Sequence, residues 1–195
     1  MAISTQLQEQ FGEIDIYLFD QLLRGRFDAR PRILDAGSGS GRNLPFFVRH
    51  GYQVAAIDRE AAAVAAIRQV VPAAVRGELD ALPWADERFD AVICSAVLHF
   101  ARDTSHWEAM VREIWRVLRR RGLFFARLAS SIGIEPLLPA TTGRLRLPDG
   151  SDRFVVNEEM LVRLTRSLGG QLLDPLKTTV VQGQRAMTTW VAEKL

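Results

Sequence analysis

The sequence predicts an α/β fold in which a mostly parallel sheet lies between helices and ends in an antiparallel hairpin. A short apolar run ends in Asp35 and leads into a glycine-rich turn at 37–41. Strand-like apolar segments then alternate with segments of helical periodicity up to residue 128, which is typical of a parallel sheet with crossover helices. Two β-rich runs, 177–181 and 187–191, are joined by a short Gln-Gly turn and therefore predict the hairpin.

Length and composition place the chain among ordinary globular proteins. Its 195 residues suffice for one domain with a full core, and 48% of them are apolar. We therefore expect one domain over residues 1–195. Residues 1–10 lack the apolar core of a signal peptide, and no run reaches the roughly 18 apolar residues of a membrane span. The single cysteine, Cys94, excludes an intrachain disulfide and fits a cytoplasmic location.

The charge pattern gives no reason to expect nucleic acid as a partner. The net charge is only +2, and the one basic run is 119–121. We interpret this run as the C-terminus of a helix, where cations suit the helix dipole. His50, His99, His106 and Cys94 show no metal-ligand spacing. We expect no metal, no nucleic acid and no membrane as partners, and either a monomer or a homodimer.

Residues 1–30 are expected to form a helical segment before the sheet. Within it, apolar side chains recur at helical spacing over 11–27 and predict one amphipathic helix. Two roles remain open for this helix. Either it packs on the core, or it covers the site as a lid with Phe11 or Tyr17 facing the substrate.

The glycine-rich turn is the clearest functional signal. Residues 33–34 read as the end of a buried strand, Asp35 stands at its carboxyl edge, and a helix is expected from about Arg42. Glycines within 37–41 let the backbone bend sharply and approach a ligand closely. Open α/β sheets bind ligands at the carboxyl ends of their strands, so Asp35 stands where a ligand would lie.

A second acid stands at the end of the next predicted strand. The apolar run 53–58 ends in Asp58, at close to the offset from Asp35 at which a strand-end carboxylate binds ribose hydroxyls. An exposed loop aspartate is the alternative interpretation. A helix over 61–71 and a short strand over 73–76 are expected to follow.

The fourth predicted strand, 88–95, leads to the end of the sheet where a reacting group would lie. Beyond it, His99 is either a substrate contact or proton acceptor, or a side chain that stacks or hydrogen-bonds beside the ligand. A helix capped by Thr104 or Ser105 and a fifth strand over 123–128 are predicted next.

Residues 129–156 interrupt the alternation with glycine, proline and serine and predict an insertion after the fifth strand. The segment 148–150 reads as a turn between two β-like runs. The insertion is either a partly mobile cover over the site, which its arginines make positively charged, or a solvated surface hairpin. Asn157 is then expected to cap a helix that runs to Leu168.

Several of these segments resemble one enzyme family. The turn reads Asp-x-Gly-x-Gly-x-Gly at 35–41, which resembles motif I of the class I S-adenosylmethionine-dependent methyltransferases. Residues 77–84 resemble the family's Gly-Asp-x-x-x-Leu-Pro-Phe stretch, with Glu78 in place of the aspartate. Residues 89–92 resemble its Phe-Asp-x-Val motif, and a terminal hairpin is typical of the family.

The resemblance implies a fold, a cofactor and a reaction. The fold is a Rossmann-like three-layer sandwich with a mostly parallel seven-stranded sheet and an antiparallel C-terminal hairpin strand. The cofactor is S-adenosyl-L-methionine, with S-adenosyl-L-homocysteine as product, and the reaction is in-line methyl transfer to a small-molecule acceptor. A narrower similarity, over 35–43 and 51–58, is to the tellurite-resistance methyltransferases, although Ser38 replaces a cysteine in the glycine loop of that branch.

The resemblance also implies roles for individual residues. Asp35 and the backbone of 37–39 would hold the methionine portion of the cofactor, and Asp58 its ribose. Glu78 and the backbone N–H of Leu79 would hold the adenine. The expected cofactor-binding residues are Asp35, Ala36, Gly37, Ser38, Gly39, Arg42, Asn43, Asp58, Arg59, Glu78, Leu79, Ser95 and Ala96. His99 is the candidate catalytic residue, and an acceptor such as a soft chalcogen or a thiolate needs no general base.

Two other functions are compatible with the same pattern. A catalytically idle member of the fold would bind the cofactor, or nothing, without turnover. A nicotinamide-dependent oxidoreductase would share the strand, glycine turn and helix, but its fingerprint is G-x-G-x-x-G and its sheet is normally all parallel.

Overall fold

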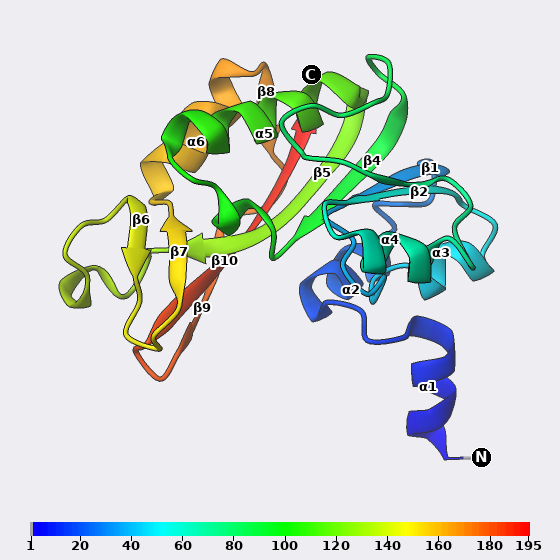
Figure 1. The fold of residues 1–195 in the computed structure, drawn as a ribbon, viewed down its shortest axis with the longest axis horizontal. Coiled ribbons are helices and arrows are strands. Elements are labelled where there is room, and N and C mark those ends of the chain that lie inside the picture. Colours follow the sequence, from blue (N-terminus) through cyan, green and yellow to red (C-terminus); the bar gives the residue numbers. More distant parts are fainter. Residues whose placement is uncertain (1) are drawn as a thin grey trace.

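A computed structural model describes residues 2–195. A twisted sheet forms the middle of the molecule, and helices cover both of its faces (Figure 1). In chain order the elements are α1 (Ile3–Phe11), α2 (Ile16–Leu23), β1 (Arg32–Ala36), α3 (Pro45–Arg49), β2 (Gln53–Asp58), α4 (Ala61–Ile67), β3 (Ala74–Arg76), β4 (Phe89–Ser95), η1 (Leu98–Phe100), α5 (Thr104–Val117), β5 (Leu118–Ser130), η2 (Glu135–Leu137), β6 (Gly143–Arg146), β7 (Asp152–Val155), α6 (Glu158–Ser167), β8 (Gly170–Leu172), β9 (Lys177–Val181) and β10 (Arg185–Lys194).

The main sheet has the strand order β3-β2-β1-β4-β5-β10-β8. Strands β1 to β5 pair in parallel, and β10 pairs antiparallel with β5. The outer edge of β10 is shared by two strands, because β9 pairs with Arg185–Thr189 and β8 with Ala192–Lys194. The eight strands therefore occupy seven positions, and the prediction of a mostly parallel sheet with an antiparallel hairpin strand is confirmed.

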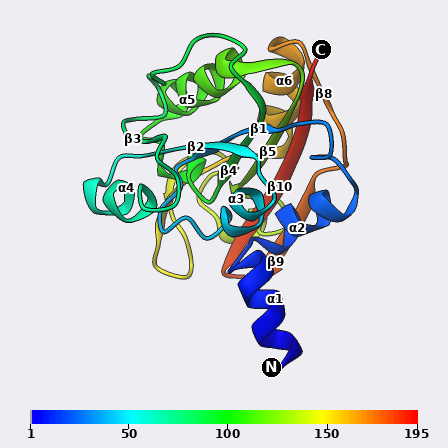
Figure 2. The same cartoon turned by 90° about the vertical axis from the view of Figure 1, so that its right-hand side faces the viewer.

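Side chains alternate along the strands and supply two separate cores. On β5, Phe124 and Leu128 belong to the core under α5 and α6, whereas Phe125 belongs to the core under α2 and α3. Figure 2 shows α5 and α6 on one side of the strands and α2 and α3 on the other. Because both faces are buried, the central strands are almost continuously apolar, as β4 illustrates with all seven residues buried.

Trp190 of β10 lies at the centre of the larger core. Its ring is fully buried, with the Phe124 ring edge-on at 4.9 Å and Trp107 stacked at 6.2 Å between centroids. Its Nε1–H donates to Thr165 Oγ1 at 3.0 Å, and Thr165 donates to Leu161 O at 2.7 Å within α6. The indole ring is thus packed against aromatic side chains and its N–H is hydrogen-bonded. These contacts join β10 to α5 and α6.

The predicted helix over 11–27 is wrong in its extent. The structure has two helices, because α1 ends at Phe11 and Gly12 adopts φ = 65°. Asp15 then starts α2 as an N-cap whose side chain accepts from Tyr17 N. Glycine with a positive φ readily ends a helix. The apolar periodicity continues across this break, so it did not reveal that the backbone forms two helices.

The helix after the glycine turn also begins later than expected. Two successive turns, in which Gly41 N donates to Ser38 O and Leu44 N donates to Gly41 O, take up the residues before the helix. The helix α3 starts at Pro45, which suits a first helical position because that N–H has no partner within a helix. The expected start at Arg42 is therefore corrected to Pro45.

Helix α5 differs from its prediction at both ends. Its cap is Asp103, which accepts from His106 N at 2.8 Å, and not Thr104 or Ser105. It ends at Val117, so the basic run 119–121 belongs to the start of β5 and not to a helix C-terminus. Arginine in this run forms ion pairs across the sheet edge, with Asp90 at 2.7 Å and Glu193 at 3.4 Å.

The insertion after β5 contains the predicted hairpin. Strands β6 and β7 pair from Gly143↔Val155 to Arg146↔Asp152, and a bridge between Ser130 and Val156 attaches the hairpin to the end of β5. Among residues 2–195, none of the helices is long and apolar enough to cross a membrane. The same residues contain no group of three His, Cys, Asp or Glu side chains that is placed to hold a metal ion.

We predict that Trp190→Ala lowers the free energy of unfolding by about 3–5 kcal/mol, because it leaves a cavity in a fully buried aromatic cluster. Urea unfolding followed by circular dichroism measures the change. Val181→Ala, at a 38% exposed position of β9, is the control and should cost within about 0.5 kcal/mol. A similar small loss for both variants would contradict the central role of Trp190.

Candidate functional site

A cavity of about 500 Å³ opens at the carboxyl ends of β1, β2 and β4. This is the edge at which parallel α/β sheets bind ligands. The cavity is lined by Gly37, Ser38, Gly39, Ser40, Arg42, Asn43, Asp58, Arg59, Glu60, Ala63, Glu78, Leu79, Ser95, Ala96, Val97, Phe100, His106 and Met110. Eleven residues of the predicted cofactor site are in this set; the other two, Asp35 and Ala36, lie behind it in β1.

The glycine turn is shaped by close backbone packing. Gly37 has φ = 83°, and a Cβ there would lie 2.3 Å from Val97 Cγ2, so no other residue fits without displacing the end of β4. Gly39 has φ = 51°, and within the described chain no atom lies within 4 Å of the place of its Cβ. Gly37 therefore allows close packing against Val97, and Gly39 leaves open space on the cavity side of the turn.

The N–H groups of this turn are bound within the protein. Gly37 N and Ser38 N donate to Ile57 O at 2.8 and 3.0 Å, and Gly39 N donates to Asp58 Oδ2 at 2.8 Å. A loop that cradles phosphates must offer free N–H groups, usually at the start of a helix. Here the donors of Gly37, Ser38 and Gly39 are used and α3 begins only at Pro45, so these three residues do not offer a phosphate cradle.

Asp58 ends β2 inside the cavity. Its two carboxylate oxygens accept separately from Gly39 N at 2.8 Å and from Glu60 N at 2.9 Å. These two hydrogen bonds fix the orientation of the carboxylate, and each oxygen keeps further lone pairs for a ligand. The side chain is positioned as an acceptor for hydroxyl groups.

Asp35 is buried at the end of β1, with 1% of its surface exposed. Among residues 2–195, its Oδ2 has no hydrogen-bond partner. Burial raises the pKa of Asp35 to about 7; the charge of Arg42 opposes this shift, and the charge of Asp58 adds to it. An unpartnered buried carboxyl is costly, and it indicates a place for a positively charged or hydrogen-donating group.

Asp90 shows what a purely structural acid looks like in the same sheet. It is 2% exposed and accepts from Arg32 through Nε at 3.1 Å and Nη2 at 2.8 Å, and Arg119 Nε lies 2.7 Å away. Burial raises the pKa of Asp90, but the hydrogen bonds from Arg32 outweigh burial and lower it below its usual value. The two buried acids therefore differ in pairing, and only the one beside the cavity is left unpaired.

The far end of the cavity combines an acid with apolar walls. Glu78 is exposed and Leu79 is buried, directly after β3. Met110 and Phe100 also line the cavity, and Arg59 and Arg153 lie over the Phe100 ring at 5.8 and 5.1 Å from its centroid. Such a slot suits a flat ring with a polar edge.

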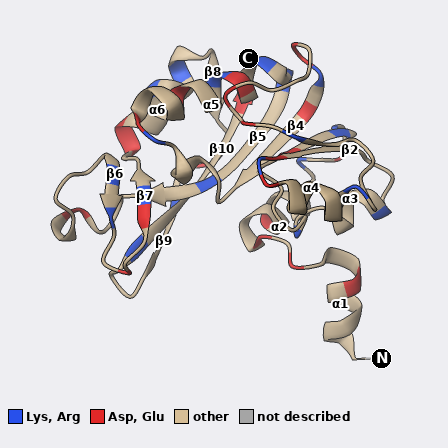
Figure 3. Cartoon of the chain, viewed as in Figure 1, with Lys and Arg blue, Asp and Glu red and all other residues tan. Residues whose placement is uncertain are grey.

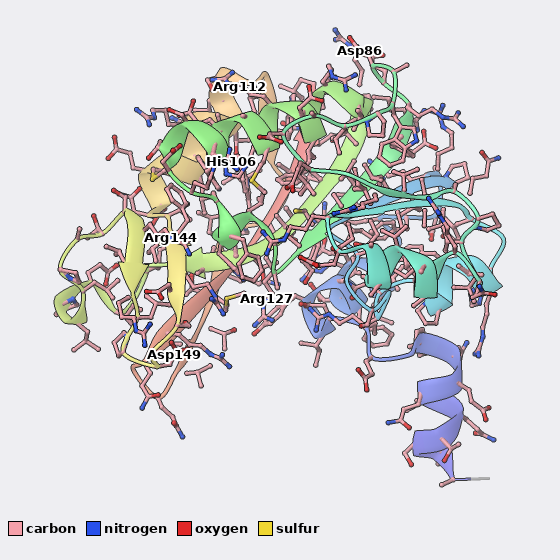
Figure 4. All side chains as sticks on the ribbon, in the orientation of Figure 1. Asp86, His106, Arg112, Arg127, Arg144 and Asp149 are labelled. Carbon is pink, nitrogen blue, oxygen red and sulfur yellow. The ribbon has the colours of Figure 1, made fainter. Side chains whose placement is uncertain are left out.

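His106, which the sequence analysis treated only as a rejected metal ligand, lines this end. Its Nδ1 accepts from Arg102 N at 3.1 Å, and its Nε2 lies 3.4 Å from Asp80 Oδ2. Figure 4 shows His106 beside α5, above the end of β5. His106 lies in the first turn of α5, and no pattern in the sequence points to it as a cavity residue.

His99, the predicted catalytic residue, is not among the lining residues. It lies in η1, 5% exposed, with the Phe100 ring edge-on at 4.6 Å. Burial lowers the pKa of His99 to about 3, and the charge of Arg153 adds to the shift. A neutral imidazole with so low a pKa is a weak proton acceptor, so the geometry gives no support to that role.

Ser95 and Ala96 end β4 at the inner wall of the cavity. Ala96 has φ = 63°, a conformation that residues with a side chain adopt at a cost and that is common at ligand sites. Ser95 Oγ donates to Asp15 Oδ2 at 3.0 Å and accepts from Arg42 Nη2 at 3.1 Å. This wall of the cavity therefore combines the strained backbone of Ala96 with the oriented hydroxyl of Ser95.

Asp15 is the residue that the sequence analysis missed. It caps α2, is 3% exposed, and its N–H donates to Asn43 Oδ1 at 3.0 Å. Besides Ser95, two guanidinium groups approach its Oδ2, Arg127 at 3.4 Å and Arg42 at 3.5 Å. One buried carboxylate therefore joins α2 to the glycine turn, β4 and β5; in the sequence it looks like any helix cap.

Comparison with known proteins finds methyltransferases. Residues 34–126 match the family model described as a methyltransferase domain. The uncharacterized methyltransferase YodH of Bacillus subtilis (strain 168) is 32% identical over 113 residues, which cover 54% of this chain and 43% of that protein. The chain therefore spans less than half the length of this curated relative.

The solved structures agree on the fold. An S-adenosylmethionine-dependent methyltransferase from Methanosarcina mazei has a TM-score of 0.68 at 20% identity, over 84% of this chain and 92% of that one. The 1,6-didemethyltoxoflavin-N1-methyltransferase of Burkholderia thailandensis, solved with 1,6-didemethyltoxoflavin and S-adenosylhomocysteine, has a TM-score of 0.68 at 20% identity, over 98% and 86%. Over residues 34–126, and in its fold, the chain is therefore similar to the methyltransferases.

The methyltransferase match covers only part of this molecule. It begins in β1 and ends in β5, so it includes the strand ends that carry Asp35, Asp58 and Ser95. The helices α1 and α2, the insertion and the last three strands lie outside it. The acids of the cavity thus belong to the matched part of the chain, and Asp15 lies outside it.

We predict that Asp35→Asn makes the protein more stable at pH 8. In the folded state the pKa of Asp35 is about 7, and in the unfolded chain it is near 3.8. Between these values only the folded state holds the proton, so the free energy of unfolding falls as the pH rises from about 4 to 7. Asparagine removes this loss, which is at most a few kcal/mol at about 1.4 kcal/mol per pKa unit.

Urea unfolding at pH 4 and pH 8 measures this effect, and the advantage of Asp35→Asn should vanish at pH 4. Asp90→Asn is the matched control with the opposite sign, because the pKa of Asp90 is lowered and its pairing stabilises the fold at neutral pH. A loss of stability in both variants at pH 8 would show that Asp35 is paired as Asp90 is.

Proposed function

We propose that this chain transfers the methyl group of S-adenosyl-L-methionine to a small-molecule acceptor. The observation that carries the proposal is the arrangement of three acids, Asp35, Asp58 and Glu78, at or just beyond the ends of three neighbouring strands around one cavity. A dinucleotide carries negative phosphates, which this wall would repel. The cofactor carries a sulfonium and an ammonium, which it would attract.

The residues of the cavity fit this cofactor group by group. The unpartnered carboxyl of Asp35 and the open space at Gly39 suit the methionine portion with its ammonium. Asp58, already held by two N–H groups, would accept from the ribose hydroxyls. Glu78 would accept from the adenine amino group, with Leu79 and Met110 against the ring.

The bound cofactor supplies an electrophilic methyl group, so the chain's own work is alignment and exclusion of water. Ser95 and Ala96 form the wall beside the reacting end, and α2 covers it through Asp15. His99 is buried and its pKa is about 3, so the proposal includes no general base. The acceptor must therefore be an anion already, or lose its proton without help from His99. A thiolate or another soft nucleophile fits this requirement.

Three expectations from the sequence stay predictions beside this proposal. They are the single domain over 1–195, the monomeric or homodimeric state, and the cytoplasmic location inferred from the lone cysteine. The nicotinamide alternative loses support, because the N–H groups of Gly37, Ser38 and Gly39 are already bound within the protein. The catalytically idle alternative differs from the proposal only in turnover.

We predict that S-adenosylhomocysteine raises the melting temperature and that NAD does not. A ligand at about 100 times its Kd adds roughly 2.7 kcal/mol, which for a chain of this size is about 5–10 °C. Asp58→Asn should weaken binding roughly 10- to 100-fold, because two ribose hydroxyls lose a charged acceptor. Differential scanning fluorimetry and isothermal titration calorimetry give both numbers.

Asp86→Asn is the matched control for this test. Its carboxylate is 75% exposed and pairs with Arg116, and Figure 4 shows it on the loop before β4, away from the cavity. It should bind S-adenosylhomocysteine like the unchanged protein. A melting shift with NAD alone would refute the proposal; binding of the sulfonium cofactor with no methyl transfer to any of a broad set of thiols, amines and phenols would favour the idle alternative.

A further inference from the structure

Arg127 lies one strand beyond the cavity wall. It is near the carboxyl end of β5, paired in register with Ser95 of β4 on one side and with Thr189 of β10 on the other. Ser95 lines the cavity, so Arg127 is the next side chain outward from the reacting end of the site. Figure 4 shows it between the end of β5 and α2.

The guanidinium of Arg127 is held on one face by Tyr17. The guanidinium carbon lies 4.7 Å from the Tyr17 ring centroid, and the Tyr17 hydroxyl bonds to Thr179 of β9. The ring therefore bridges α2 and β9 and fixes the plane of the guanidinium. The contact with Tyr17 therefore orders the Arg127 guanidinium.

The ionic partners of Arg127 are incomplete. Arg127 Nη1 lies 3.4 Å from Asp15 Oδ2, and Arg42 lies 3.5 Å from the same oxygen. Charge-assisted hydrogen bonds between such groups are normally about 2.7–2.9 Å long, as in the 2.8 Å contact of Arg32 with Asp90. Two guanidinium groups thus share the Asp15 carboxylate at long distance, and neither forms a short ion pair with it.

Two buried polar atoms beside this charge also lack partners. Across residues 2–195, neither Arg127 Nε nor Thr189 Oγ1 has a hydrogen-bond partner, and Thr189 is only 4% exposed. Buried polar atoms are nearly always bonded, so a missing ligand is the natural reason for an unbonded pair on adjacent strands. One donor of a guanidinium and one hydroxyl match the two oxygens of a carboxylate.

We propose that Arg127 and Thr189, with Tyr17 behind the guanidinium, bind a carboxylate of the methyl acceptor. This inference rests on the proposed function and adds the class of substrate, a small carboxylate-bearing molecule. Arg42, which itself lines the cavity beside the glycine turn, is left for the cofactor's own carboxylate. The β6–β7 hairpin also contains Arg144 and Arg153, and Figure 3 shows blue, basic segments on β6.

The test measures binding of benzoate and of its uncharged analogue benzamide by NMR titration. Both probes are titrated into the free protein and into its complex with S-adenosylhomocysteine. Benzoate should bind the complex roughly 10- to 100-fold more tightly than benzamide, because only the carboxylate forms charge-assisted hydrogen bonds. Equal binding of the two probes, or no binding of benzoate, would overturn the inference.

Three variants assign the binding to this place. Arg127→Gln should abolish the preference for benzoate, and Thr189→Val should reduce it several-fold without loss of stability, because the removed hydroxyl has no partner within the described chain. Arg120→Gln is the matched control, since Arg120 is exposed at the other end of the same strand. A preference that persists in both Arg127→Gln and Thr189→Val would refute the assignment.

Competition separates this inference from the proposed function. If benzoate displaces S-adenosylhomocysteine, the charge serves the cofactor's carboxylate and the inference is wrong, although the proposed function stands. If S-adenosylhomocysteine does not bind at all, the proposed function fails, and the benzoate titration of the free protein still tests the anion site. Binding of both together, with nuclear Overhauser effects between the two ligands, is the expected result.

Discussion

The cost of burying charge at the carboxyl edge of the sheet governs this molecule. Parallel strands bring Asp35, Asp58 and Ser95 to one edge, and the helices that cover both faces remove much of that edge from water. Asp90, at the opposite edge, is relieved by two arginines. For Asp35 the charge of Arg42 only partly opposes burial, and burial raises its pKa to about 7. An acid that destabilises the fold and lies beside a cavity is best explained by a ligand that neutralises it.

The same electrostatic problem joins the two ends of the site. Asp15 accepts from Ser95 and lies within 3.5 Å of both Arg42 and Arg127, so the glycine turn, β4, β5 and α2 share one carboxylate. A ligand that binds one of the two guanidinium groups weakens the interaction of that group with Asp15. The Asp15 carboxylate can then interact more strongly with the other guanidinium. If the proposed function and the proposed carboxylate site hold, cofactor and acceptor would be coupled through Asp15, which contacts neither of them. In sequence, Asp15 and Arg127 lie outside the shared glycine motif, which leaves acceptor choice free to vary while cofactor binding stays fixed.

The sequence was informative wherever a local pattern determines the structure. Apolar runs gave the strands, and each parallel strand carries its last residue to the same edge, so Asp35 and Asp58 could be placed together in advance. Long-range contacts were invisible. Asp15 reads as an ordinary helix cap, and nothing local distinguishes His106 in the cavity from His99 behind it. The basic run 119–121 has the composition of a helix end, yet it lies within β5, between Leu118 and Leu123, which pair with β4, and it forms ion pairs to Asp90 and Glu193.

A strand, a glycine turn and an acid do not by themselves separate a phosphate site from a sulfonium site; the use of the backbone donors does. When the N–H groups of the turn face outward at the start of a helix, the site is positive and selects phosphate. Here those of Gly37 and Ser38 are bound to Ile57 O, that of Gly39 is bound to Asp58, and the following helix is short and begins late. The carboxylates then dominate the local potential, and the same topology selects a cation. The inward hydrogen bonds of the turn thus determine which class of cofactor the edge of this sheet can hold.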